Sequence, residues 1–334
     1  MAFKHHPPPF AVQLGMGVFM EGFFRPVIRT MERLGRAELL FRGSNRRLAK
    51  RLEKKNPFRG YLPGPQDVFV MTYAKSGTNW MMQIAHQLIY HGKGDYEHIH
   101  NVIPWPDTQA MAVVRGRYAI PLEQARHWET SPERKRIIKS HYNWQLLPYS
   151  DQARYIAVIR DPKDIFVSNY FFLRDAAFGR AMPSVNTWFK LYLSEDFILG
   201  GSWAVNTAGY WAERHRPNVL IVSFKSMKRD LRNTVVKVAE FLNIRVSDQV
   251  IDDVCRQSSF EYMKKIDDKF GIGKLIPWRR PGAMIRKGSE GGASELLSLE
   301  RRREMDAHFI AELNQLGSDF PYRQFCDLTP GIAT

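Results

Sequence analysis

The sequence has few cysteines and no apolar run long enough to cross a bilayer. Its only cysteines are Cys255 and Cys326. Two cysteines cannot build a disulfide framework or, alone, a zinc site, and they favour a reducing compartment. The apolar stretch Phe10–Phe24 contains Gln13 and Glu21 and is shorter than the roughly 20 apolar residues that span a membrane. It also lacks a small-residue cleavage site, so we expect no secretory signal.

Acidic residues are also scarce. The chain has 49 Lys and Arg against 34 Asp and Glu, a net charge of +15. Residues 25–60 alone hold twelve Lys and Arg against three Glu, a net charge of +9. A uniformly basic chain would suggest nucleic acid, but an excess confined to one N-terminal segment indicates an anionic surface near that segment. We therefore expect no nucleic-acid partner.

Residues 1–60 are predicted to form a basic amphipathic N-terminal arm. Pro26 suits the first turn of a helix. The basic face of that helix would carry Arg25, Arg29, Arg33 and Arg36. The opposite, apolar face would carry Val27, Ile28, Met31 and Leu34. This pattern is typical of a helix that lies on an anionic membrane. The alternative is that the apolar stripe packs on the main domain and the arginines are solvated.

Residues 61–325 are predicted to form a single domain, followed by a C-terminal tail at residues 326–334. Short apolar strands are expected at residues 68–72, 137–140, 155–159 and 219–222, with helices between them. This alternation predicts a three-layer α/β fold, a central parallel β-sheet flanked by helices. Ligands bind such sheets at the C-terminal strand ends. Lys75, His141 and Arg160 each follow a predicted strand, so we expect them to converge.

The stretch Thr72–Trp80 predicts a P-loop-like phosphate site. A strand, a small-residue turn that holds a lysine, and a helix point backbone N–H groups at an anion. In a nucleotide P-loop the Lys follows the second Gly, whereas here Lys75 precedes Gly77. We also recognise no strand that ends in an Asp suited to Mg²⁺. These features favour a metal-free nucleotide site, with a P-loop kinase-like phosphotransferase as the alternative.

Four segments resemble motifs of the cytosolic sulfotransferase family, and they follow one another along the chain in the family's order. Members of this family use 3′-phosphoadenosine 5′-phosphosulfate (PAPS). Thr72–Trp80 looks like the family's 5′-phosphosulfate loop, and Lys139-Ser140-His141 matches the segment with its catalytic histidine. Arg160–Ser168 resembles the 3′-phosphate segment, and residues 285–288 resemble the C-terminal Arg-Lys-Gly loop. The resemblance runs from about residue 63 to residue 316 and is specific because the motifs occur together.

The resemblance implies a PAPS-dependent sulfotransferase that needs no metal and releases adenosine 3′,5′-bisphosphate (PAP). His141, with an ordinary pKa near about 6.5, would take the acceptor hydroxyl's proton. Lys75 would stabilise the leaving oxygen, and Lys139 the transferring group. The implied PAPS-binding residues are Lys75, Ser76, Gly77, Thr78, Asn79, Trp80, Arg160, Ser168, Phe224, Ser258, Phe260, Arg286, Lys287 and Gly288.

The sequence departs from the family at two positions near the nucleotide. Phe224 stands where the family usually has Tyr, and Gly291-Gly292-Ala293 replaces Gly-Asp-Trp. We expect a looser hold on PAPS with unchanged chemistry. The family's dimer signature is not recognisable near residues 247–254, which leaves the oligomeric state open.

The acceptor is not defined by the sequence. Its pocket is expected in loops near residues 95–125, 172–200 and 266–282. The basic arm suggests a small-molecule or lipid-linked hydroxyl acceptor and a cytoplasmic protein that is peripheral on the membrane. The alternative is a catalytically silent nucleotide- or membrane-binding protein of the same fold, which the retention of Lys75, Lys139 and His141 opposes.

Overall fold

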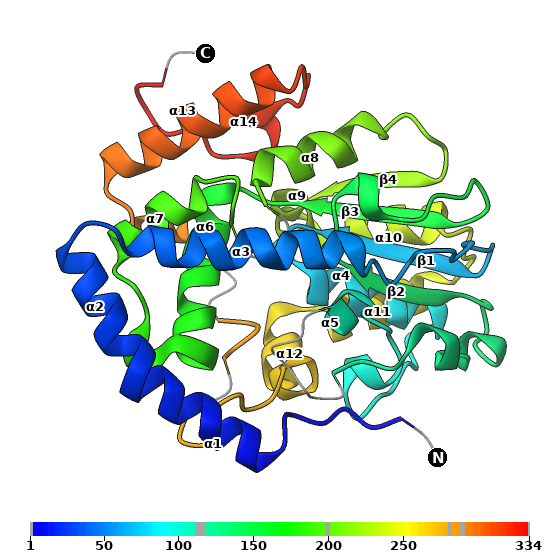
Figure 1. The fold of residues 1–334 in the computed structure, drawn as a ribbon. Coiled ribbons are helices and arrows are strands. Elements are labelled where there is room, and N and C mark those ends of the chain that lie inside the picture. Colours follow the sequence, from blue (N-terminus) through cyan, green and yellow to red (C-terminus); the bar gives the residue numbers. More distant parts are fainter. Residues whose placement is uncertain (1–2, 111–117, 198–200, 280–281, 287–290, 333–334) are drawn as a thin grey trace.

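A parallel sheet flanked by helices forms the centre of the protein (Figure 1). The computed structural model describes residues 3–110, 118–197, 201–279, 282–286 and 291–332. The strands are β1 (Asp67–Thr72), β2 (Arg136–Ser140), β3 (Arg154–Ile159) and β4 (Val219–Ser223), in the order β2-β1-β3-β4. All described pairings are parallel. The predicted α/β fold with a central parallel sheet is confirmed.

Helices cover both faces of the sheet. The helices of the structure include α1 (Phe10–Val18), η1 (Phe19–Phe24), α2 (Arg25–Arg33), α3 (Ala37–Lys54), α4 (Thr78–Ile89), α5 (Asp107–Ala110), α6 (Pro162–Leu173), η6 (Arg174–Phe178), α7 (Val185–Tyr192), α8 (Trp203–Ala212), α9 (Phe224–Arg229), α10 (Leu231–Phe241), α11 (Asp248–Gln257), α12 (Phe260–Lys265), α13 (Leu299–Gln315) and α14 (Tyr322–Phe325). The last long helix therefore begins later than the residue 293 expected from the sequence, after a short 3₁₀ turn at Gly292–Glu295. None of the helices in the described ranges has the length and hydropathy to cross a bilayer.

Strand β1 connects the two halves of the core. Successive side chains of a strand face opposite layers, so Val68 and Val70 pack with α4, α10 and α11. Phe69 and Met71 pack towards α8 and the C-terminal end of α3. In the parallel register Met71 lies beside Ser140 of β2 and beside β3. The C-terminal ends of β1, β2 and β3 therefore meet at one edge of the sheet.

Helices α1, η1 and α2 form one continuous helix along the outside of the domain, and α3 then crosses back (Figure 1). The backbone stays helical through Phe19 and Arg25, the residues at the two junctions. The turn between them, η1, is a π-helix. Pro26 lies in the first turn of α2, as expected, but α2 is not a separate helix, because the continuous helix begins at Phe10 and passes through this proline.

The predicted faces of α2 also need correction. Ile28, expected on an exposed apolar face, is fully buried in a core cluster with α6 and α7. Arg29 donates hydrogen bonds to the carbonyls of Arg180 and Met182, at 2.9 and 3.2 Å. The helix ends at Arg33. Part of the predicted lipid-facing stripe therefore packs on the domain, which was the alternative to membrane binding for these apolar residues.

Candidate active site

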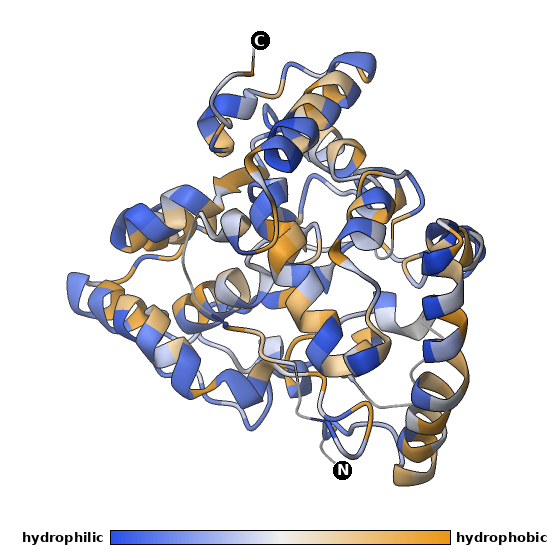
Figure 2. Cartoon of the chain, turned by 90° about the vertical axis from the view of Figure 1, so that its left-hand side faces the viewer, coloured by the Kyte–Doolittle hydropathy of each residue, from blue (hydrophilic) through white to orange (hydrophobic). Residues whose placement is uncertain are grey.

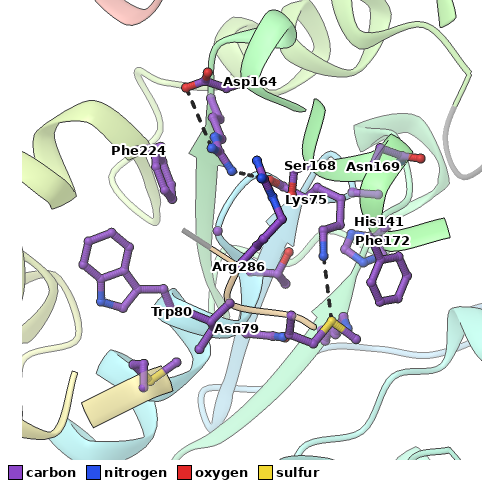
Figure 3. Close-up of a pocket in the computed structure, with 18 of the residues that line it drawn as sticks. Lys75, Asn79, Trp80, His141, Asp164, Ser168, Asn169, Phe172, Phe224 and Arg286 are labelled. Carbon is purple, nitrogen blue, oxygen red and sulfur yellow. Dashed lines mark hydrogen bonds and ion pairs between the residues drawn. The ribbon is translucent and has the colours of Figure 1, made fainter. Parts of the chain in front are cut away.

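A cavity of about 550 Å³ lies at the C-terminal edge of the sheet (Figure 3). Most of the residues predicted for the site line it, namely Lys75, Gly77, Thr78, Asn79, Trp80, Lys139, His141, Arg160, Ser168, Phe224, Phe260 and Arg286. The structure thus brings the residues that follow β1, β2 and β3 together. Ser76 and Ser258 are fully buried, and neither hydroxyl has a hydrogen-bond partner within the described residues. Lys287 and Gly288 lie outside the described residues.

The turn between β1 and α4 has the form of an anion cradle. Lys75 and Gly77 have positive φ angles of 72° and 102°, a conformation that glycine adopts without strain. A Cβ atom on Gly77 would lie 2.8 Å from Cδ2 of Phe224, so only glycine fits. Helix α4 then begins at Thr78, and its free backbone N–H groups point towards the turn.

Lys75 places an ammonium group over the cradle. Its Nζ lies 3.8 Å from Sδ of Met284 and 4.1 Å from the ring centroid of Phe172. Arg160 donates a hydrogen bond of 3.1 Å to the Lys75 carbonyl. Burial, followed by the charge of Arg160, lowers the pKa of Lys75 to about 8. An anion bound here would be the natural partner for both cations.

His141 is held in a single tautomer. Its Nδ1 lies 2.9 Å from the carbonyl oxygen of Thr72. A carbonyl can only accept, so Nδ1 carries the proton and Nε2 is left as the acceptor nitrogen. Burial is the main cause that lowers the pKa of His141 to about 3, and Lys139 and Lys75 add to it. The expected ordinary pKa is therefore wrong for the protein alone.

Lys139 lies beside this histidine in an aromatic and imidazole environment. Its Nζ is 3.5 Å from the ring centroid of Trp105 and 3.4 Å from Nε2 of His100. Burial lowers its pKa to about 7, opposed by the carboxylate of Asp107 and assisted by Lys75. Lys139 can therefore be charged or neutral near neutral pH, depending on what binds next to it.

Two arginines lie at the end of the cavity predicted to take the 3′-phosphate. Arg160 stacks on Phe224, with Cζ 4.2 Å from the ring centroid, and forms an ion pair of 3.7 Å with Asp164. Arg286 makes a bidentate ion pair with Glu295, at 2.8 and 3.0 Å. A phosphate that binds Arg286 must therefore compete with this carboxylate.

Aromatic rings line the end of the cavity predicted for adenine. Trp80 donates a hydrogen bond of 2.7 Å to the carbonyl of Ser258, so Ser258 contacts the site through its backbone. The rings of Trp80 and Phe224 meet edge to face, with centroids 5.6 Å apart. Phe260 lines the same cavity. The three rings predicted to contact adenine therefore line one cavity, and the adenine platform itself stays a prediction.

Some residues that shape the site were missed from the sequence. Asp107 accepts from the backbone N–H of His141 at 2.6 Å and from the Ser140 hydroxyl at 3.0 Å. A lone acidic residue in a loop gives no pattern that could have revealed this. Phe172 could have been found, because Asp164, Ser168 and Phe172 recur every fourth residue on α6 and all line the cavity.

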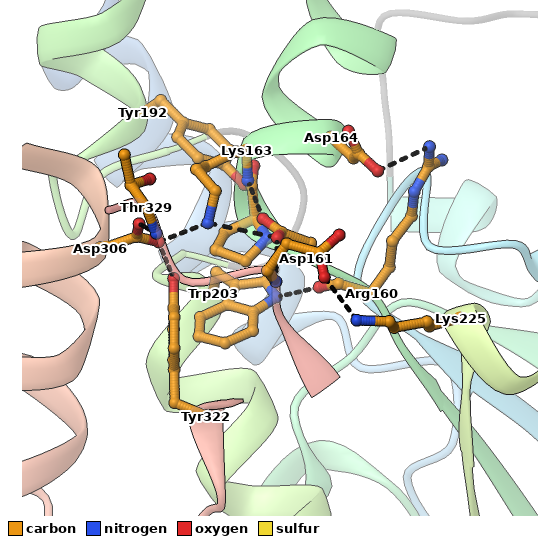
Figure 4. Close-up of polar contacts among 12 residues, drawn as sticks. Arg160, Asp161, Lys163, Asp164, Tyr192, Trp203, Lys225, Asp306, Tyr322 and Thr329 are labelled. Carbon is orange, nitrogen blue, oxygen red and sulfur yellow. Dashed lines mark hydrogen bonds and ion pairs between the residues drawn. The ribbon is translucent and has the colours of Figure 1, made fainter. Parts of the chain in front are cut away.

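The start of α6 is fixed by a buried polar network (Figure 4). Lys163 forms ion pairs with Asp306 of α13 and, at 3.2 Å, with Asp161. Asp306 also accepts from the Tyr322 hydroxyl at 2.7 Å and from the Thr329 N–H at 2.9 Å. The C-terminal segment therefore positions the turn that carries Arg160 and the start of α6, the helix that carries Ser168.

The comparisons with known proteins agree with this geometry. The sulfotransferase domain family model matches residues 65–317. The chain belongs to the sulfotransferase family. This sulfotransferase is 29% identical to sulfotransferase 2A1 of Macaca fascicularis over 262 residues, which cover 77% of the chain and 88% of the relative. It is 31% identical to sulfotransferase 2A2 of Mus musculus over 248 residues, covering 73% and 83%. It is a PAPS-dependent sulfotransferase of the cytosolic type.

Solved structures share the fold of this sulfotransferase. Retinol dehydratase in complex with androsterone and the inactive cofactor PAP has a TM-score of 0.64 at 19% identity, covering 82% of this chain and 88% of that one. Mouse sulfotransferase SULT7A1 complexed with PAP has a TM-score of 0.57 at 22% identity, covering 76% and 87%. At these identities the likeness establishes the fold alone.

Proposed function

We propose that the enzyme transfers the sulfuryl group of PAPS to the hydroxyl of a hydrophobic or lipid-linked acceptor, with His141 as the general base. The observation that carries the proposal is the 2.9 Å contact between His141 Nδ1 and the Thr72 carbonyl. It leaves Nε2 as a proton acceptor in the same cavity as Lys75 and Lys139. A base and two cations in one cavity suit an in-line transfer between oxygens.

The proposed reaction moves one sulfuryl group between oxygens. His141 Nε2 takes the acceptor's proton while the acceptor oxygen forms a bond to sulfur. The bond between sulfur and the 5′-phosphate oxygen breaks, and Lys75 stabilises the negative charge left on that oxygen. Lys139 stabilises the sulfuryl oxygens. The anionic donor offsets the lysine charges that depress the pKa of His141, so the base strengthens when the site is filled.

The donor would lie along the cradle and the aromatic end of the cavity. The turn N–H groups and Thr78 suit the 5′-phosphate, and Arg160, Ser168 and Arg286 suit the 3′-phosphate. Ser76, Asn79, Lys287 and the Gly288 backbone remain proposed contacts. Trp80 and Phe260 would sandwich adenine, with Phe224 at its edge.

The acceptor end of the cavity is apolar. Trp105 contacts both Lys139 and His141, and the other residues of the lining that are not assigned to the nucleotide include Tyr118, Phe172, Leu173, Ile272 and Met284. A pocket of this character favours an acceptor with a large apolar body and a hydroxyl near His141. Such acceptors concentrate in membranes, and we therefore propose a cytoplasmic enzyme that works peripherally on the membrane.

The test of the base is His141→Ala, with the exposed His215→Ala as a matched control. The first variant should lose turnover by about a hundredfold or more and keep its affinity for PAP. The control should keep both. Loss of PAP affinity in His141→Ala would mean that this histidine supports the fold and does not act as the base.

The acceptor can be identified with sulfur-labelled PAPS. The enzyme is incubated with small phenols, sterols and fractionated lipids, and the labelled product is analysed by mass spectrometry. We expect label in an apolar alcohol or lipid fraction. Label found only in water-soluble acceptors would contradict the proposed substrate class.

A further inference from the structure

The exposed face of α1 and η1 is apolar throughout. Its exposed residues recur in adjacent pairs every four positions, and they are Phe10, Ala11, Leu14, Gly15, Val18, Phe19, Gly22 and Phe23. We call this face the α1–η1 ridge. Phe10, Val18 and Phe23 are 68%, 62% and 61% exposed. The polar Gln13 points inward and donates to the carbonyl of Pro8 at 2.7 Å. A helix on a protein surface normally has the opposite arrangement.

The ridge is held outward by contacts on the inner side of the helix. A Cβ on Gly17 would overlap the ring of Trp278, at 2.2 Å, so the helix lies flat against this tryptophan. Glu21 forms an ion pair with Arg279. Phe24 packs edge to face on Phe41 of α3. The fold itself therefore leaves the apolar side chains on the outside.

Cations flank the ridge on the same side of the molecule. Helix α3 crosses the same side as α1 and α2 (Figure 1), and the hydropathy view in Figure 2 shows hydrophobic residues concentrated at the α1 end of the continuous helix. The exposed basic residues of α2, α3 and the turns that follow them are Arg33, Arg36, Arg46, Arg47, Lys50, Arg51, Lys54, Lys55 and Arg59. An apolar ridge beside such a basic surface matches the headgroups and acyl chains of an anionic bilayer.

A second copy of the chain fits this surface less well. Two copies docked through the ridge would bring two segments of net charge +9 (twelve Lys and Arg against three Glu in residues 25–60) close together. Like charges brought together oppose association. An anionic bilayer can bind both the apolar ridge, through its acyl chains, and the basic residues, through its phosphates.

We propose that the α1–η1 ridge inserts into the headgroup region of an anionic bilayer, with the basic residues of α2 and α3 on the lipid phosphates. Docking of the ridge does not depend on the proposed reaction. The inner side of the same helix packs, at Gly17, against the segment that holds Trp278, and Ile272 of that segment lines the cavity. Docking would therefore set the acceptor end of the cavity close to the lipid, a consequence that does rest on the proposed function.

The test measures binding of the full chain to phosphatidylcholine vesicles with and without phosphatidylglycerol, by co-sedimentation. The ridge variant is Phe10→Ser/Phe19→Ser/Phe23→Ser, and its matched control is Leu62→Ser, at a leucine that is 87% exposed elsewhere. The affinity of the ridge variant for anionic vesicles should fall by about tenfold or more. The control should bind as the wild type does.

A charge variant measures the contribution of the basic residues separately from that of the apolar ridge. Lys50→Gln/Lys54→Gln/Lys55→Gln should weaken binding to anionic vesicles on the order of a hundredfold and leave binding to neutral vesicles unchanged. PAP affinity is measured for every variant to show that it is folded. If the Phe variant fails this check, Leu14→Ser/Val18→Ser replaces it.

Two results would overturn the proposal. One is equal vesicle binding by the wild type and the ridge variant. The other is a wild-type dimer that becomes monomeric in the ridge variant without a change in vesicle binding, which would assign the face to contact between copies. Vesicle binding with an inactive enzyme would support docking and reject only the proposed function.

Discussion

A single backbone carbonyl determines which nitrogen of His141 can act. Thr72 ends β1, and its carbonyl accepts from Nδ1 of His141 at the end of the neighbouring strand β2. Asp107 holds the backbone of His141 from the other side. The sequence reveals the histidine and the strand end, but the tautomer follows from a contact between residues far apart in the chain.

The lysines of the site make PAP binding pH-dependent. Lys75 and Lys139 have pKa values of about 8 and about 7, in both cases lowered chiefly by burial. At pH 8 the phosphates of PAP are fully ionised, since their second pKa is about 6. Binding of the anion should raise both lysine pKa values and take up roughly one proton at pH 8. PAP affinity should therefore fall as the pH rises from 7 to 9.

Calorimetry in buffers of different ionisation enthalpy measures this uptake. Lys139→Arg keeps its charge over the whole range, so its proton uptake should be smaller than that of the wild type. Proton release, or an affinity that does not change between pH 7 and pH 9, would show that these lysines do not pair with the nucleotide.

Glu295 is predicted to compete with the nucleotide for Arg286. Their ion pair is bidentate and about a quarter to a third exposed, with exposed fractions of 24% and 30%. A pair of this exposure contributes up to about 1 kcal/mol, so Glu295→Gln should tighten PAP binding roughly threefold. Glu304→Gln, which removes a similar pair with Arg301 on α13, is the control. Weaker binding in Glu295→Gln would mean that Glu295 orients Arg286 and does not block it.

At the level of elements, the C-terminal helix α13 stabilises the phosphate-binding turn. Asp306 is fully buried and pairs with Lys163. Removing one partner of a buried pair leaves an uncompensated charge, so Asp306→Ala should lower the free energy of unfolding by about 3–5 kcal/mol. PAP affinity should also fall, because Arg160 leads into the same turn. Chemical denaturation and PAP titration measure the two effects.

An exposed pair is the control for this prediction. Asp319 pairs with Arg214 and its side chain is 70% exposed, so Asp319→Ala should cost less than about 1 kcal/mol. If Asp306→Ala and Asp319→Ala lowered stability equally, the buried network would not be what holds the turn.

The strands and the cradle could be predicted because they depend on local sequence. Short apolar runs predicted all the described strands to within one residue of their ends. The start of α6 also follows locally from Pro162. The continuous helix from Phe10 to Arg33 could not be predicted, because Pro26 suggests a break. The wider π turn of η1 precedes this proline and lets the helix continue past a residue without an N–H.

The missed contacts of the site are tertiary in origin. Glu295 lies nine residues after Arg286, at the end of the 3₁₀ turn Gly292–Glu295, and no periodicity links the two residues. Asp107 reaches His141 from a separate loop. The exposure of the α1–η1 ridge was likewise hidden, because the sequence shows which residues are apolar but not which side of the helix the domain covers.

At the scale of the whole molecule, several buried histidines make the fold sensitive to acid. Burial lowers the pKa of His86 and of His98 to about 4 and that of His141 to about 3, and it lowers the pKa of His100 well below its ordinary value. The unfolded chain binds protons at these positions near pH 6.5, whereas the native protein does not. Stability should therefore fall as the pH drops from 7 to 5.

Each of these histidines should cost about 1–2 kcal/mol of unfolding free energy at pH 5 relative to pH 7. Asp107 opposes them, since burial raises its pKa to about 6 and its protonation in the native state favours folding. Urea denaturation at each pH measures the net effect. His86→Leu isolates one contribution, because Nε2 of His86 has no hydrogen-bond partner in the described structure.

The difference in stability between pH 7 and pH 5 should shrink by about 1–2 kcal/mol in His86→Leu. His215→Ala, at an exposed histidine, is the control. A stability that stays flat or rises on acidification would show that the native protein admits protons to these rings. The buried histidines would then be open to solvent, and His141 would be a stronger base in the protein alone than its burial implies.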